Sequence, residues 1–374
     1  MLLGKVSRAV SRPEIHLVAG TRPNFMKVAP LYHALREQDW CRPVLVHTGQ
    51  HYDEDMSGAF QRDLGLPRPD HALEVGSGSH AEQTGGVMMA YEKLCLAEPP
   101  AWVVVVGDVN STLACALVAA KLCLPLAHLE AGLRSGDRTM PEEINRLVTD
   151  RLADLLWTPS PDADDNLRAE GTAEARIERV GNIMIDAYEL HRSSIAAART
   201  RERFGLPAGG YGVVTLHRPV NVDDREALRV LVAALAASAG KLPLVFPVHP
   251  RTRQRLETFG LAEGLGAAAG VHLTAPLGYI DFMSLVAESA LVITDSGGLQ
   301  EETTYLGLPC LTLRETTERP ITLTQGTNRL IRPDGLAAAV GEALSGAWPR
   351  GRRPDLWDGQ TAARVARSLH RRLS

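Results

Sequence analysis

The stretch Leu291 to Leu313, LVITDSGGLQEETTYLGLPCLTL, decides how this chain folds. Its apolar start, Leu291-Val292-Ile293, predicts a buried strand, and Thr294 to Gly298 predicts the turn that ends the strand. Leu299 then opens a predicted helix. A strand, a glycine turn and a helix N-terminus in succession form an anion site, because unpaired amide groups and the positive end of the helix dipole point at the same place. On its own, a glycine pair is equally typical of an ordinary strand-to-helix turn.

The same succession occurs near the start of the chain. Glu14 to Ala19 predicts a strand, Gly20-Thr21-Arg22-Pro23 a turn, and the residues that follow a helix that carries Lys27 and that Pro30 can kink. An arginine in such a turn can bind a diphosphate through a two-pronged contact. A solvated loop arginine fits this pattern about as well.

Acidic residues follow two more predicted strands. Val103 to Val106 ends in Asp108, and Pro125 to Leu129 ends in Glu130. Alternating strands and helices indicate a parallel sheet, whose ligands bind at the carboxyl ends of the strands. One acid at such an end is also typical of a helix cap, but several on one edge favour a site.

A helix is predicted from Met140 to about Leu156. It places Glu142 and Arg146 four residues apart on one face, which is also the spacing of a solvent-facing ion pair. Farther on, Glu302 follows one turn into the helix after Gly298, where a carboxylate can grip the hydroxyl pair of a ribose.

Two runs of strand and helix alternation predict an α/β protein with two Rossmann-like, doubly wound domains. We expect residues 1–185 to form the first, completed by a C-terminal helix within residues 356–374, and residues 186–355 to form the second. The connection should lie near residues 184–205. A chain of 374 residues is long enough for two such cores.

Composition excludes several classes of partner and site. The net charge of −4 provides no overall field that favours nucleic acid or an anionic membrane. No apolar run is long enough to span a bilayer, and no signal peptide is present. The five cysteines form no CxxC pair, so we expect reduced thiols in a cytoplasmic protein rather than disulfides or a metal site.

Several segments together resemble one family. They are GTRPNFMKVAPL, HTGQHYD, VVGDVNSTLA, HLEAGLRSGDRTMPEEINR, GNIMID, LHRP, PVHPRTR and ITDSGGLQEE followed by TTERP. Their order and spacing resemble the UDP-N-acetylglucosamine 2-epimerases over residues 14–370, nearly the whole chain. The resemblance implies the glycosyltransferase-B architecture, a homodimer, and a UDP-sugar held between the domains. It also implies interconversion of UDP-GlcNAc and UDP-ManNAc without a metal or redox cofactor.

The resemblance further implies roles for individual residues. Residues that hold the diphosphate would be Arg22, Ser296, Gly297 and Gly298. Glu302 would bind the ribose and Phe282 would frame the uracil. The catalytic set would be Asp108, Glu130, Glu142 and His217. Further active-site positions would be Lys27, Arg134, Arg146 and His249.

The chemistry that the resemblance implies requires such residues. The family eliminates UDP across C1 and C2, leaving a 2-acetamidoglucal, and adds UDP back with a proton on the other face. Elimination needs a base at C2 and cations at the leaving diphosphate. Three carboxylates close together also push their pKa values apart, which suits acid and base roles.

The sequence departs from the family pattern at some positions. Asn24 stands where many members carry glutamate, and LHRPVNVDD replaces a GHRRE-like segment. Ser77 to His80 lacks the Arg-Gln pair that binds an activating second UDP-GlcNAc in several bacterial members, so we do not expect this activation.

Three other functions fit parts of the pattern. A hydrolysing relative would release free ManNAc and UDP from the same glycal. A glycosyltransferase-B transferase would share the TDSGG turn but lack the HLEAGLRSGD segment. A protein that only binds nucleotide sugars would not need all three acids, Asp108, Glu130 and Glu142.

Overall fold

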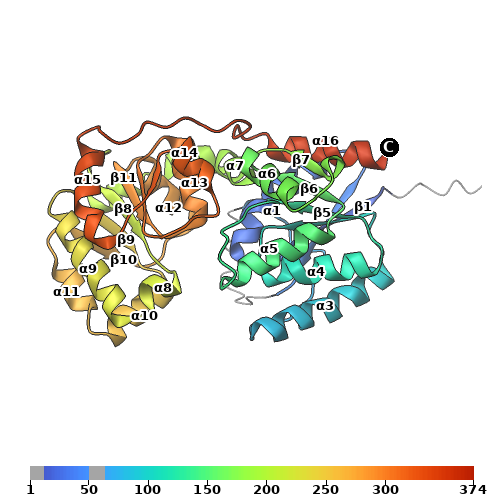
Figure 1. Cartoon of the computed structure of the whole chain (residues 1–374), viewed down its shortest axis with the longest axis horizontal. Coiled ribbons are helices and arrows are strands. Elements are labelled where there is room, and N and C mark those ends of the chain that lie inside the picture. The colour runs from blue at the N-terminus through green and yellow to red at the C-terminus, as the bar shows by residue number, and fades with distance from the viewer. Residues whose placement is uncertain (1–11, 50–63) are drawn as a thin grey trace, which may run out of the picture.

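The computed structural model describes residues 12–49 and 64–374, but not the side chain of Arg22. The Gln50 to Asp53 part of the HTGQHYD segment lies outside this description. Figure 1 shows two halves side by side, each built around its own sheet. All strand pairs in both sheets are parallel.

Within the described residues, the first sheet has the order β3-β2-β1-β4-β5-β6-β7. Its strands are β1 (Glu14–Ala19), β2 (Arg42–His47), β3 (His71–Ala72), β4 (Trp102–Val106), β5 (Leu126–Leu129), β6 (Leu155–Thr158) and β7 (Ile177–Arg179). The helices of this half are α1 (Arg22–Arg36), α3 (His80–Ala97), α4 (Asn110–Lys121), α5 (Pro141–Leu152), α6 (Pro161–Ala169) and α7 (Ile183–Ala198), with a 3₁₀ turn at Glu174–Arg176.

The second sheet repeats this order as β10-β9-β8-β11-β12-β13 among the same described residues. Its strands are β8 (Gly212–Thr215), β9 (Leu244–Pro247), β10 (Val271–Thr274), β11 (Leu291–Thr294), β12 (Cys310–Thr312) and β13 (Asn328–Leu330). Its helices are α8 (Pro219–Val222), α9 (Arg225–Ala239), α10 (Pro250–Thr258), α11 (Ala262–Ala267), α12 (Tyr279–Ala287), α13 (Gly297–Leu306), α14 (Pro320–Thr324) and α15 (Leu336–Leu344), with 3₁₀ turns at Thr200–Phe204 and Pro333–Gly335. The predicted pair of doubly wound sheets is confirmed.

The central strands are buried because helices cover both faces of each sheet. All five residues of β4, WVVVV, are buried. Such a continuous run of β-branched residues is typical of a parallel strand with no solvent face. In the first sheet, α1 and α16 pack on the side of Leu17, and α3 and α4 pack on the side of Val18.

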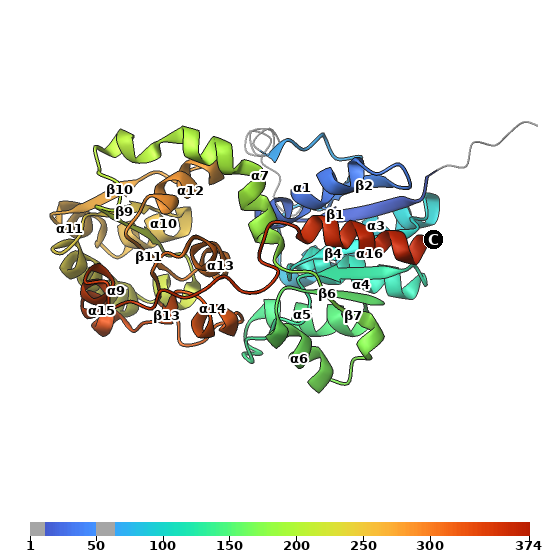
Figure 2. The ribbon, with the colours of Figure 1, turned by 90° about the horizontal axis from the view of Figure 1, so that it is seen from above.

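The last helix, α16 (Thr361–Leu373), returns to the first half, as Figure 2 shows. Val365 and Leu369 are fully buried in the core that α1 and β1 form. Both carboxylate oxygens of Asp186, at the start of α7, accept hydrogen bonds from the first amides of α16, at 3.1 and 2.8 Å. A capping acid on α7 thus attaches the C-terminal helix to the first half.

Some predicted elements differ from the structure. The helix predicted from Met140 to about Leu156 ends at Leu152, because Ala153 is extended and Leu155–Thr158 joins the sheet as β6. A short apolar run fits either element, and pairing with β5 and β7 decided this one. The connection near residues 184–205 is largely helical, since α7 occupies most of it. α1 continues through Pro30 to Arg36.

Candidate active site

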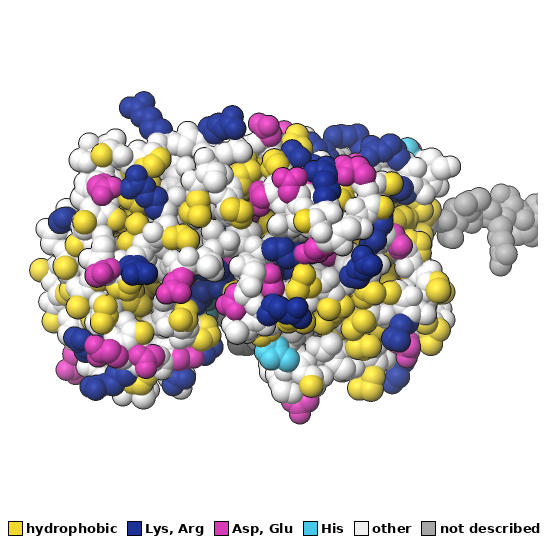
Figure 3. All heavy atoms as spheres, viewed as in Figure 1, with side chains coloured by type: hydrophobic (Ala, Val, Ile, Leu, Met, Phe, Trp, Pro, Cys, Tyr) yellow, Lys and Arg dark blue, Asp and Glu magenta, His cyan; other side chains and the backbone are white. Residues whose placement is uncertain are grey.

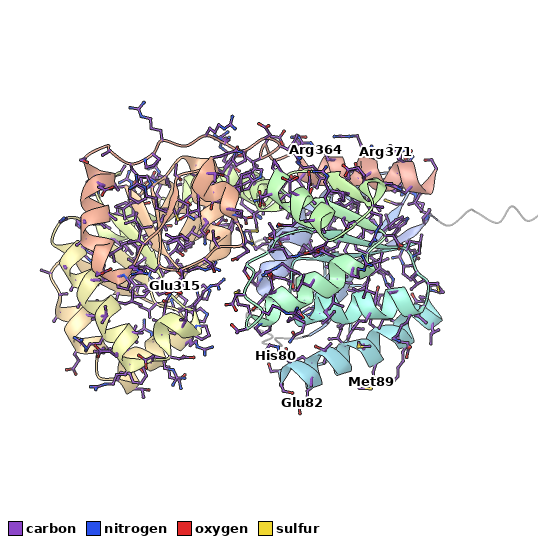
Figure 4. All side chains as sticks on the ribbon, in the orientation of Figure 1. His80, Glu82, Met89, Glu315, Arg364 and Arg371 are labelled. Carbon is purple, nitrogen blue, oxygen red and sulfur yellow. The ribbon has the colours of Figure 1, made fainter. Side chains whose placement is uncertain are left out.

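The carboxyl ends of the two sheets face each other. Glu130 follows β5 in the first half, and Arg319 follows β12 in the second. The Arg319 Nη2 group donates to Glu130 Oε1 at 2.9 Å, which joins the two halves directly. The surface is hollowed between the halves in Figure 3, and Figure 4 shows His80 at the end of α3 that faces this hollow.

A buried cluster of charges lies where the halves meet. Glu130 pairs with Lys27 of α1 as well as with Arg319. Glu318 pairs with both Arg319 and Arg314, and its nearest oxygen to Arg314 is 2.7 Å away. Burial raises the pKa of Glu130, but Lys27 and Arg319 outweigh burial and hold this pKa below its ordinary value. Glu130 is therefore a carboxylate held in its ionised form.

The glycine turn lies against this cluster. Ser296 precedes α13, and Gly297 and Gly298 are its first two residues. A Cβ atom on Gly297 would lie 2.6 Å from both Arg319 Nη1 and Glu318 Oε1. The Ser296 side chain makes no capping hydrogen bond, and the Ser296 amide donates to Thr294 Oγ1 at 2.9 Å. Within the described residues the amides of Gly297 and Gly298 have no side-chain acceptor, so these two remain available to an anion.

Glu302 lies one turn into α13 and is buried. Its Oε1 accepts a hydrogen bond of 2.8 Å from the hydroxyl group of Tyr279, on α12. Burial raises the pKa of Glu302 to about 8. Phe282, also on α12, is half-buried and packs against the apolar cluster that contains Leu299. The predicted ribose and uracil residues thus lie on neighbouring helices of the second half.

Asp108 lies after β4 and binds Arg146. The Arg146 Nη1 group donates to Asp108 Oδ2 at 2.5 Å, and its Nη2 donates to Glu143. Glu143 also accepts hydrogen bonds from the backbone of Ser135. The alternative interpretation, a solvent-facing ion pair between Glu142 and Arg146, does not fit: Glu142 is exposed, whereas Arg146 is only 2 % exposed and pairs with Glu143. Glu142 lies close enough to Arg218, across the gap, to influence that arginine's pKa.

Two histidines border the second half of the site. His217 Nδ1 lies 3.0 Å from the buried carboxylate of Asp295, which also accepts the backbone amide of His217. The His249 ring centre is 5.6 Å from that of His217. Burial and the nearby His217 lower the pKa of His249. Asp295 thus fixes His217 beside Ser296, with its ring still 38 % exposed.

Arg134 contacts a different pair of acids. Arg134 pairs with Asp150 and Glu170, at 2.7 Å in each case, so its guanidinium is engaged within the first half. Arg22 is the first residue of α1, and its side chain lies outside the described part of the chain. The role predicted for each remains a prediction.

Three residues of the site were not singled out in the sequence. Arg319 joins the halves, Asp295 orients His217, and Glu143 holds Arg146. Each lies inside a segment that carries the resemblance: TTERP, ITDSGG and PEEINR. Each of these charged residues lies in the same segment as a residue that the sequence did predict for the site, and this proximity was the signal that could have identified it. The sequence does not show which charged residue of a segment points inward, because that depends on the fold.

Within residues 12–49 and 64–374, no group of three His, Cys, Asp or Glu side chains is placed to hold a metal ion. In the same residues, no helix combines the length and apolar character that crossing a bilayer requires.

Comparisons with known proteins identify the family. The family model described as UDP-N-acetylglucosamine 2-epimerase matches residues 33–370. The chain belongs to the UDP-N-acetylglucosamine 2-epimerase family. The UDP-N-acetylglucosamine 2-epimerase of Methanocaldococcus jannaschii is 42% identical over 326 residues, which cover 85% of this chain and 88% of that protein.

Two further comparisons show the range of this epimerase family. The UDP-2,3-diacetamido-2,3-dideoxy-D-glucuronate 2-epimerase of Pseudomonas aeruginosa is 42% identical over 322 residues, with 85% of this chain and 88% of that protein covered. A crystal structure of the M. jannaschii UDP-GlcNAc 2-epimerase in complex with UDP-GlcNAc and UDP superposes with a TM-score of 0.87. It has 39% sequence identity and covers 96% of this chain and 99% of that chain. The glycosyltransferase-B architecture of this epimerase family is therefore confirmed for the chain.

Proposed function

We propose that this family member reversibly epimerises UDP-GlcNAc and UDP-ManNAc at C2. The main support is the meeting of the acid-bearing edge of the first sheet with the glycine turn of the second, through Glu130 and Arg319. The M. jannaschii relative, which was crystallised with UDP-GlcNAc and UDP, supports the choice of nucleotide sugar.

The reaction proceeds by elimination and re-addition. A base removes the proton at C2, the electron pair forms a C1–C2 double bond, and the bond from C1 to the diphosphate oxygen breaks. UDP and 2-acetamidoglucal remain together until UDP adds back to C1 and a proton reaches C2 on the opposite face. We assign the proton transfers to the set of Asp108, Glu130 and Glu142, with His217 as a further catalytic residue.

Binding roles follow the geometry of the second half. The open amides of Gly297 and Gly298, the hydroxyl group of Ser296 and the guanidinium of Arg319 receive the diphosphate, where they stabilise the charge that develops on leaving UDP. Glu302 binds the ribose and Phe282 frames the uracil. Lys27, Arg146 and His249 line the sugar side, and Arg22 and Arg134 remain part of the proposed binding set.

The proposal extends to the organisation of the protein. We propose a first domain of residues 1–185 completed by residues 356–374, and a second of residues 186–355. The position of α16 in the first core supports this boundary. We also propose a homodimer and a cytoplasmic location, and no metal or redox cofactor is needed for the reaction as written.

A specific observation favours a second candidate substrate. The P. aeruginosa relative that acts on UDP-2,3-diacetamido-2,3-dideoxy-D-glucuronate has 42% identity, the same value as the M. jannaschii enzyme. The same elimination at C2 would apply to that sugar. Competition between the two UDP-sugars, measured as kcat/KM for each, decides between them.

Incubation with UDP-GlcNAc in D2O, followed by NMR, tests the reaction. Both UDP-GlcNAc and UDP-ManNAc should acquire deuterium at C2, and the same mixture should form from either side. A hydrolysing enzyme also labels C2, so the anomeric carbon must be followed. UDP that rises in step with free ManNAc, without UDP-ManNAc, would establish the hydrolysing reaction instead.

A further inference from the structure

A buried carboxylate beside the proposed diphosphate site has no role in the scheme above. Glu301, on α13, is only 1 % exposed. Its Oε1 lies 2.9 Å from Nε of Arg319, and its Oε2 has no hydrogen-bond partner among the described residues. Glu301 therefore relies on one cation to keep its negative charge in the protein interior.

That cation is shared with two other acids. Arg319 also pairs with Glu130 and Glu318. Each of these acids has a second cation of its own, Lys27 for Glu130 and Arg314 for Glu318. Glu301 is thus the acid of this cluster with the fewest groups to stabilise its ionised form.

A diphosphate at the glycine turn would change the balance of charge. Lys27, Arg314 and Arg319 pair with Glu130, Glu301 and Glu318, and Arg218 lies 3.8 Å from Glu318, so the acids already engage the cations of this cluster before a ligand arrives. Arg319 Nη1 borders Gly297, where the anion would lie. An anion there competes for Arg319, and its charge disfavours a nearby carboxylate.

We propose that Glu301 takes up one proton from solvent when the diphosphate of UDP or of a UDP-sugar binds, which frees Arg319 to bind the phosphate. The inference rests on the proposed function, since it requires a diphosphate at this turn. Only a proton moves: it comes from solvent, forms the O–H bond of a neutral carboxylic acid, and returns to solvent when the ligand leaves. Glu301 is thus a positioning residue that acts through Arg319.

The electrostatics of the free protein agree with this role. Burial raises the pKa of Glu301 to about 7, against the opposing influence of Arg319 and Lys27 and with a contribution from Glu130. Glu301 is therefore close to half ionised near neutral pH. Ligand binding raises this pKa further, so UDP binds more tightly as the pH falls through the range between the free and bound values.

Other groups near the turn can also take up protons. Glu302 is adjacent on α13, and its pKa is raised to about 8 by burial. His217 and His249 lie next to each other on the second half. The test must therefore separate Glu301 from these groups.

Calorimetry of UDP binding at pH 8, in buffers with different ionisation enthalpies, counts the protons taken up. The wild-type protein should take up about 0.5 proton or more per UDP, because Glu301 is mostly ionised when free and protonated when bound. Glu301→Gln, which resembles the neutral acid, should lose this uptake. Its UDP Kd should also vary little between pH 7 and 9, whereas the wild-type Kd should rise by up to about tenfold per pH unit.

Glu178→Gln, on β7 and away from the turn, is the control, and it should retain both UDP binding and the proton uptake. Glu302→Gln changes the proposed ribose residue and should weaken UDP binding, but the number of protons taken up per UDP bound should persist. Absence of uptake in the wild type, or equal uptake in Glu301→Gln, would overturn the inference, and the wild-type measurement decides even if the variant fails to fold. UDP that binds without uptake leaves the proposed function intact, whereas no UDP binding at any pH contradicts the proposed function itself.

Discussion

Two turns of this protein share a sequence pattern but differ in what their amides contact. The first turn lies between β1 and α1. There the amides of Gly20 and Thr21 both donate to Asn24 Oδ1, at 3.3 Å, and Asn24 Nδ2 donates to the carbonyl of Val106 at 2.9 Å. Ser111 occupies the space beside Gly20, since a Cβ atom there would lie 2.4 Å from its Oγ. In the first turn, Asn24 therefore accepts from both amides, and Ser111 fills the space beside Gly20.

The second turn, between β11 and α13, is open. The amide of Ser296 donates to Thr294 Oγ1 at 2.9 Å, but among the described residues no side chain accepts from the amides of Gly297 and Gly298, and the Arg319 guanidinium lies beside Gly297. A strand, a glycine turn and a helix therefore do not make an anion site unless the amides are left without an internal acceptor. Under the proposed function, the open turn of the second half binds the diphosphate and the first half supplies the acids, with Arg22 as a further proposed contact from the first turn.

The largest effect on turnover should come from Glu130, which pairs with Arg319 beside the second turn. Glu130→Gln should lower turnover by about 10²- to 10⁴-fold, the range for loss of a proton-transfer group. UDP affinity should survive, because the open turn of the second half is unchanged. Steady-state kinetics and calorimetry measure the two quantities. Asp108→Asn and Glu142→Gln should act in the same direction.

The control for this change is Glu178→Gln, on β7, whose partner Arg371 lies on α16. It removes an acid of the first half away from the gap and should leave turnover within about twofold. Near wild-type turnover in Glu130→Gln would show that Glu130 serves only as an ion pair between the two halves. The proposal that it takes part in proton transfer would then be wrong.

The second-largest effect should come from substitutions in the two glycine turns, which are expected to differ in what they change. Gly297→Val should weaken UDP binding by about tenfold or more, since the side chain displaces Arg319 and blocks approach to the amides; losing one charge-assisted contact alone costs about 1.5–3 kcal/mol. Gly20→Val should instead lower the unfolding midpoint, because it clashes with Ser111 in a buried turn. Calorimetry with UDP and thermal unfolding of both variants give the comparison. Unchanged UDP affinity in Gly297→Val would remove the diphosphate from this turn.

The smallest effect should come from opening the first turn. Asn24→Ala removes the acceptor of two amides and should destabilise the protein by about 0.5–2 kcal/mol, the usual range for a lost N-cap. UDP affinity should change by less than about twofold, because the hydrogen bonds of Asn24 to other described residues all lie in the first half. Urea unfolding and calorimetry test both statements. Tighter UDP binding would show that the freed amides of the first turn accept an anion.

The sequence alone determined the two sheets and the position of several candidate site residues at the ends of their strands. Continuous apolar runs such as Val103 to Val106 specify buried parallel strands, because only strands covered on both faces lack polar positions. The acids Asp108 and Glu130 follow such strands, so their place at the edge of the sheet could be predicted. The TDSGG segment likewise predicts a turn at the start of a helix, because an apolar run followed by glycines is a local signal.

The tertiary structure decided the partners of these residues. Arg146 pairs with Glu143 and Asp108 rather than with Glu142. Leu155 lies in a strand rather than in the predicted helix. Arg319 met Glu130 across 189 positions of sequence. Local pattern fixes which residues form a strand, turn or helix, because backbone hydrogen bonds and side-chain periodicity act over a few residues. The pairing of buried charges depends on contacts between segments that are distant in the sequence. A buried charge without a partner has a high desolvation cost, so the stable fold is one in which these charges are paired.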